Sequence, residues 1–204
     1  MHGENGNILK ELRQHAPFTI FGAITGIACM LIFKNVSRDT IHTLFYIFHP
    51  GHVLLGAMVT TAMFRNYSSR KIFIKTLIVG FVGSIGIATL SDSIIPYIGE
   101  YILGMQAEPH IGFIESPYIV TLTAIVGVLL GYCWPKTHFP HAGHILLSTW
   151  ASSFHMVMAI KPEQGLTLFL LGGCLVFLFL AVWLPCCTSD IVFPLLIAKT
   201  ERKK

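Results

Sequence analysis

Residues 41–64 read IHTLFYIFHPGHVLLGAMVTTAMF and contain no Lys, Arg, Asp or Glu. A helix needs about 20 predominantly apolar residues to cross the hydrocarbon core of a bilayer, so this stretch is long enough to do so. Near its middle stand two histidines, His49 and His52, which an α-helix places on one face because they are three positions apart. The stretch therefore predicts a membrane helix that carries an ionisable pair.

The rest of the chain shares this apolar character. The chain has 204 residues and a mean hydropathy of +0.68, and 12% of its residues are charged, about half the fraction usual in a soluble domain. None of the long apolar stretches alternates in the way that a strand of a membrane barrel would. We therefore expect an all-α integral membrane protein with six transmembrane helices, the other five at about 17–33, 76–98, 118–134, 141–160 and 165–184.

The charge distribution predicts how these helices are oriented. The net charge is +4, and only Lys34, Arg38 and Lys161 fall in predicted outer segments, which leaves eleven of the 14 Lys and Arg residues on the side of the N-terminus. Positive residues collect on the cytoplasmic side of membrane proteins, so we expect a multi-pass protein with both termini in the cytoplasm. The positive net charge is then explained by the orientation of the helices in the membrane, and we expect no nucleic-acid partner. Membrane lipid is an expected partner, and a homodimer is a reasonable expectation for so small a unit.

Two polar motifs occur twice in the chain, in the same order. H-x-G-H stands at 49–52 and again at 141–144, and S-D-x-x-x-P stands at 91–96 and again at 189–194. Each half of the chain holds three predicted helices, an odd number, so the second half would enter the membrane from the opposite side. We therefore expect two inverted three-helix repeats, an arrangement typical of transporters.

The repeat divides the chain into five parts. The connecting loop between the repeats contains three glutamates and a histidine but no Lys or Arg, so it would either attract cations or form a solvated connection, which is the simpler interpretation. The parts are a cytoplasmic segment 1–16, a first repeat 17–98, the outer connecting loop 99–116, a second repeat 117–197 and a basic cytoplasmic tail 198–204.

The repeated motifs contain the residue types that bind transition metals. Histidine and aspartate are costly in hydrocarbon and normally face the interior of a helix bundle. Neutral imidazole and carboxylate are also usual ligands of Zn, Mn, Fe, Co and Ni. We predict a metal site built from His49, His52, Asp92, His141, His144 and Asp190. Further candidate residues on the same helical faces or beside the aspartates are His42, Ser91, His138, His155 and Ser189.

Each motif also has a structural interpretation. A buried histidine is often only hydrogen-bonded in place, and Ser-Asp before a proline can cap the next helix. The five cysteines lie within or against predicted helices, where packing is the usual role, although Cys186 and Cys187 could add soft ligands. The predicted depths of the motifs allow two half-sites on opposite sides of the membrane or one central site.

Four functions fit these residues. The first is a small transporter of divalent transition-metal cations, and the inverted repeat favours it. The second is a membrane-embedded zinc hydrolase acting on a lipid, although two nearly equal motifs argue against a single lopsided catalytic centre. The third is an electron-transfer protein in which two histidines bind haem b. The fourth is a channel or proton relay built on histidine and aspartate alone.

Overall fold

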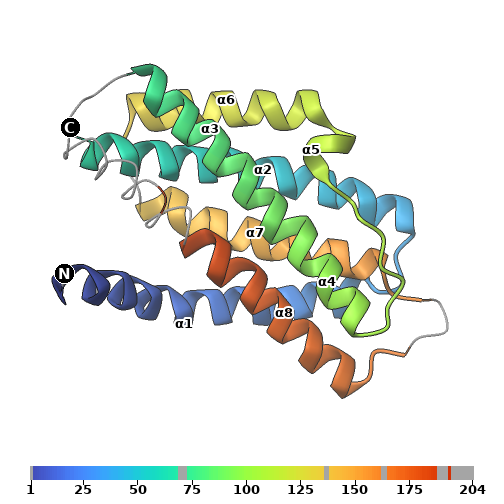
Figure 1. The fold of residues 1–204 in the computed structure, drawn as a ribbon. Helices are drawn as coiled ribbons and strands as arrows, with labels where there is room; N and C mark the ends of the chain where they lie inside the picture. Colours follow the sequence, from blue (N-terminus) through green and yellow to red (C-terminus); the bar gives the residue numbers. More distant parts are fainter. Residues whose placement is uncertain (1, 69–72, 136–137, 162–164, 188–192, 194–204) are drawn as a thin grey trace.

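The structure is a computed structural model that describes residues 2–68, 73–135, 138–161, 165–187 and 193. Within the helices, the side chains of residues 2–15, 67, 138–141 and 187 lie outside the described part. Every regular element in the described residues is helical (Figure 1). In chain order they are α1 (His2–Phe33), α2 (Arg38–Tyr67), α3 (Phe73–Thr89), the π-helix η1 (Leu90–Ile94), α4 (Ile95–Ile102), α5 (Gly112–Glu115), α6 (Pro117–Cys133), α7 (His138–Met158) and α8 (Leu168–Cys187).

Four of the described helical segments are long and apolar enough to cross a membrane, in agreement with the predicted class of helical membrane protein. They are Ala16–Phe33, Arg38–Asn66, Phe73–Ile102 and Leu168–Cys186. The other two predicted spans are helical as well, but α6 has only 17 residues and α7 contains many histidines, serines and threonines. That these two helices also cross the membrane stays a prediction.

The long helices form one bundle in which successive helices run in alternate directions (Figure 1). α3, η1 and α4 follow one another without a break and make a single rod. α2 and α7 pack against each other, α2 also packs against α3 and α6, and α7 also packs against α1 and α8. The polar residues of α7 are therefore enclosed by other helices. They lower the mean hydropathy of α7, so hydropathy alone does not identify this helix as a membrane span.

The two faces of α3 differ in a way that suits a lipid environment. Most of its exposed residues are large and apolar, among them Ile74, Ile78 and Val82. Its buried residues are mostly small or polar, among them Thr76 and Gly83. Lipid tails accept the apolar outer face, whereas small inner residues let neighbouring helices approach closely.

Two glycines let α6 pack tightly against α2. A Cβ at Gly127 would overlap the carbonyl group of Leu54, and a Cβ at Gly131 would overlap that of Met58. Because α2 lies between α6 and α7 (Figure 1), this close contact leaves the opposite face of α2 turned toward α7. That face carries the paired histidines.

The π-helix places an aspartate inside the bundle. The backbone N–H of Ile95 donates to the carbonyl of Leu90, five residues earlier, which is the π-helical pattern. Ser91 and Asp92 lie in this turn and are buried. The helical rod then continues to Ile102. The Ser-Asp pair therefore lies within a continuous rod, further from its end than the sequence predicts.

Candidate metal-binding site

The carboxylate of Asp92 is the centre of a buried polar cluster. Its Oδ2 atom lies 2.9 Å from Nδ1 of His49 and 2.7 Å from Nδ1 of His52. Its Oδ1 atom accepts hydrogen bonds from the hydroxyl groups of Ser91, at 2.7 Å, and Ser148, at 2.8 Å. Asp92 is 0% exposed, and a carboxylate is tolerated at such a place only when its acceptor sites are filled in this way.

This carboxylate fixes the tautomer of both histidines on α2. Because a carboxylate has only acceptors, each Nδ1 must donate, and a neutral imidazole then keeps its lone pair on Nε2. Metal-binding histidines usually have such a carboxylate on the other ring nitrogen, since it orients the ring and makes it more basic. The lone pair on Nε2 is the one through which such a histidine can bind a metal, and of the two residues His52 belongs to a group of potential ligands.

A second histidine and a cysteine lie close to His52. The rings of His52 and His144 have their centroids 5.4 Å apart. Cys186 comes from the end of α8, and one potential ligand atom from each of these three buried residues lies within 4.8 Å of the others. Two imidazoles and a thiolate at this spacing can bind one zinc-like ion and leave a fourth position open. We call His49, His52, Asp92, His144 and Cys186 the core cluster.

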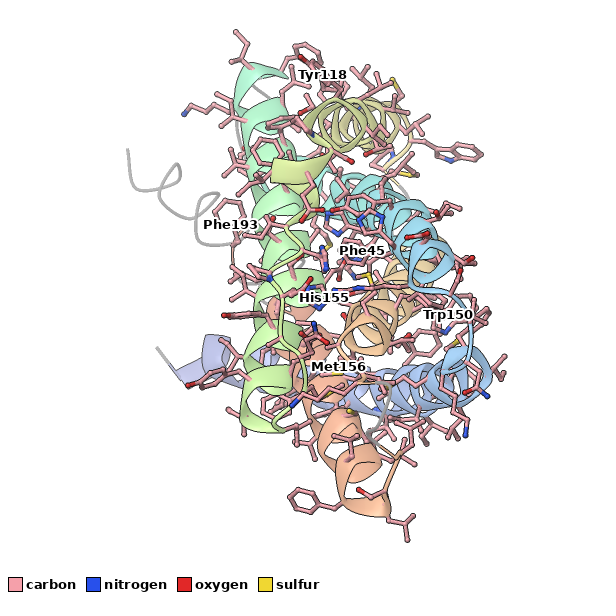
Figure 2. All side chains as sticks on the ribbon, turned by 90° about the vertical axis from the view of Figure 1, so that its right-hand side faces the viewer. Phe45, Tyr118, Trp150, His155, Met156 and Phe193 are labelled. Atoms are coloured by element: carbon pink, nitrogen blue, oxygen red, sulfur yellow. The ribbon has the colours of Figure 1, made fainter. Side chains whose placement is uncertain are left out.

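A further buried pair lies beside the core cluster. Nδ1 of His155 is 2.6 Å from Oε1 of Glu100, and neither side chain is more than 1% exposed. The ring of Phe45 is stacked on His49, at 5.4 Å, and meets His155 edge-on, at 5.6 Å. Phe45 and His155 both lie in the interior of the bundle (Figure 2). Ionisable groups therefore extend beyond the core cluster toward the start of α2.

The structure brings together the described members of both H-x-G-H motifs. His49 and His52 both contact Asp92, and the ring of His144 lies beside that of His52. Whether they form one central site or part of two half-sites stays a prediction. Two other candidates lie elsewhere: His155 pairs with Glu100, and His42 stands at the start of α2.

The remaining predictions concern the Ser91-Asp92 pair and four candidate residues near the ends of α7 and α8. The capping interpretation of Ser91-Asp92 does not hold, because the N-cap of α4 is Ile94 and makes no side-chain hydrogen bond. The side chains of His138 and His141, and the whole of Ser189 and Asp190, lie outside the described residues, so their part in the site stays a prediction.

Glu100 is the residue for which the sequence is misleading, and Cys186 is one whose two interpretations the structure leaves together. Glu100 falls in the predicted solvated loop, yet it lies on α4 and is 0% exposed. Its spacing from Asp92, eight residues or about two helical turns, is the signal that could have placed it on the same face. Cys186 packs with Ile145 and Val182 as a cysteine on an apolar helix usually does, and it also lies close enough to His52 and His144 to be a candidate ligand.

Comparisons of the chain with protein-family models, with curated proteins and with solved structures give no match.

Proposed function

We propose that this protein is a small membrane transporter of divalent transition-metal cations. The observation that carries the proposal is the meeting of His52, His144 and Cys186, from three different helices, within the space that one ion can bridge. A cation in a buried site needs counter-charge as well as ligands, and Asp92 provides a carboxylate directly behind His52. The metal is cargo in this proposal, bound and released in each cycle.

The ligand types narrow the choice of ion. Thiolate is a soft ligand and imidazole an intermediate one, a combination that suits Zn²⁺ and Co²⁺. Mn²⁺ is bound best by carboxylate, carbonyl and water ligands, which Cys186 does not supply. Among Zn, Mn, Fe, Co and Ni, we therefore expect zinc and cobalt to be preferred over manganese.

The arrangement of the helices supports transport over static binding. α2 and α7 carry the two H-x-G-H motifs, run in opposite directions (Figure 1) and meet at His52 and His144. We infer that α6 and α7 also cross the membrane, so that six spans form two inverted repeats with both termini in the cytoplasm. The core cluster would then lie between the repeats, where transporters of this kind bind their cargo.

Metal uptake by proteoliposomes tests this proposal. The purified chain is reconstituted with a metal-sensitive dye inside the vesicles, and Zn²⁺, Mn²⁺, Fe²⁺, Co²⁺ or Ni²⁺ is added outside. We expect uptake of zinc and cobalt, lost in His52→Ala and in His144→Ala. Ser153→Ala is a matched control on α7, because its buried hydroxyl donates to the carbonyl of Trp150 in the same helix and it lies outside the core cluster. A folded protein that moves none of the five ions would refute the proposal.

The same preparation separates the alternative functions. A haem protein would be purified with a Soret absorption band that both histidine substitutions remove. A zinc hydrolase would release product from the vesicle lipid when zinc is added, without net movement of the ion. Proton flux that needs no metal would instead identify a histidine–aspartate relay.

A further inference from the structure

We propose that His42, His110 and Glu115 form a second site for a divalent transition metal at the end of the bundle where α2 begins. One potential ligand atom from each of the three residues lies within 4.8 Å of the others. His42 belongs to α2 and Glu115 to α5, while His110 lies in the segment that leads into α5. Two histidines and one glutamate are a ligand set known to bind zinc with an open position for water. We call these three residues the rim cluster.

The geometry of the rim cluster is centred on Glu115. Its Oε1 atom lies 3.3 Å from Nδ1 of His110, and its Oε2 atom lies 3.8 Å from Nε2 of His42. The hydroxyl of Tyr46, one helical turn after His42, donates a hydrogen bond to Oε2. A carboxylate oriented by a neighbouring group in this way is ready to bind before the metal arrives.

The ring nitrogens of His110 are placed where they could bind a metal. Its side chain is 17% exposed, and neither ring nitrogen has a hydrogen-bond partner within the part of the chain that the structure describes. Ring nitrogens that are shielded from water and make no hydrogen bond are available to bind a cation.

The other charged groups near His110 do not complete its hydrogen bonding. Oε2 of Glu108 is 3.8 Å from Nε2 of His110, beyond hydrogen-bond distance. The same oxygen is 2.5 Å from the guanidinium of Arg38, which neutralises the glutamate. Glu115 is therefore the carboxylate best placed to join His110 in binding a cation.

The rim cluster is open to solvent, unlike the core cluster. The side chains of His42 and Glu115 are 46% and 34% exposed. His42 and His52 are ten residues apart on α2, so these two histidines are separated by about 15 Å along the helix. His110 lies 5.7 Å from His155, centroid to centroid, and Phe45 links His155 to His49. Resting on the proposed transport function, we infer that the rim cluster captures the ion before it reaches the core cluster.

Cobalt binding to the full-length chain in detergent tests the site without any need for transport. Co²⁺ is titrated while its visible absorption and the bound metal per chain are recorded. We expect His110→Ala and Glu115→Gln each to remove one bound Co²⁺ or to weaken its binding at least tenfold. Asp39→Asn is the matched control, because Asp39 is an exposed carboxylate on the same end of α2 and lies outside the cluster. Thermal unfolding of each variant verifies that it is folded.

The outcomes distinguish this site from the core cluster. Cobalt binding that is unchanged in both rim variants overturns the rim site, even if the wild-type chain transports metal. Cobalt binding that is lost in both rim variants and kept in His144→Ala supports the rim site, even if no flux is found. Equal losses in Asp39→Asn and Glu115→Gln would mean general attraction by negative charge and would also overturn it.

Discussion

The core cluster and the rim cluster use similar ligands in opposite surroundings. In the core cluster the side chains of His49, His52 and Asp92 are at most 2% exposed, and Asp92 is fully hydrogen-bonded. In the rim cluster the carboxylate of Glu115 is partly exposed, accepts a hydrogen bond from Tyr46 and lies beside His42 and His110. The first arrangement is rigid and costly to disturb, whereas the second can exchange its ligands with water.

In the transport function that we propose, this difference would give the core cluster the task of selecting the ion and the rim cluster the task of capturing it. A buried site can select among ions, because unpaired polar groups are penalised strongly where water is absent. A partly exposed site binds and releases quickly, because water replaces the ion at little cost. Substitutions in the core cluster should therefore change stability and selectivity together, and those in the rim cluster should change binding alone.

The largest expected effect is that of Asp92→Ala. It leaves two histidines and two serines of the buried cluster without their common partner, so we expect the chain to lose about 3–5 kcal/mol of stability. Asp92→Asn keeps the shape and some of the hydrogen bonds, and should lower zinc affinity about 10–100-fold with a smaller loss of stability. Thermal unfolding in detergent and zinc titration measure the two quantities. An unchanged unfolding temperature in Asp92→Ala would show that the core cluster is no more rigid than the rim.

The junction between the clusters is tested by Gly112→Ala. Gly112 begins α5, and a Cβ at this position would overlap the ring of His49. We expect a loss of about 1–3 kcal/mol, the usual cost of overpacking, and weaker binding at both clusters because α5 also carries Glu115. The control is Gly86→Ala on α3, where a Cβ meets nothing within 4 Å and a gain of about 0.5–1 kcal/mol is expected. Equal unfolding temperatures for these two variants would contradict the packing argument.

Selectivity of the core cluster is tested by Cys186→Ser. Replacing the thiol by a hydroxyl removes the soft ligand, so zinc and cobalt uptake should fall at least about tenfold relative to manganese uptake. Cys174→Ser provides the comparison, because Cys174 is also a buried cysteine of α8 in an apolar cluster but lies outside the group formed by His52, His144 and Cys186. Competition between zinc and manganese in the vesicle assay measures the ratio. The same change of ratio in both variants would exclude Cys186 as a ligand.

The smallest effect on stability is expected for Glu115→Gln in the rim cluster. The glutamine can still accept a hydrogen bond from Tyr46, and the site is partly exposed, so stability should change by no more than about 0.5 kcal/mol. Its cobalt affinity should nevertheless fall, which separates binding from folding. A loss of stability comparable with that of Asp92→Ala would mean that the rim is a structural element.

Much of the fold follows from local pattern. Apolar length predicts helices at each of the expected positions, and the spacing of His49 and His52 correctly places both on one face of α2. The same pattern does not predict that other helices surround α7, because the hydropathy of a helix depends on its own residues and not on its neighbours. Glu100 shows the same limit, since a charged residue near the end of a span appears solvated until its partner His155 is known.

The sequence by itself determined the helical class, the apolar lengths and the choice of metal-binding residue types, because these depend on composition and on the fixed period of a helix. Only the tertiary structure decided which of those residues meet. The pairing of Asp92 with α2, the place of Cys186 beside His52, and the grouping of the rim cluster each join residues from different elements. Such meetings depend on how helices rotate and pack, and the π turn at Leu90–Ile94 alters that rotation in a way that local periodicity does not reveal.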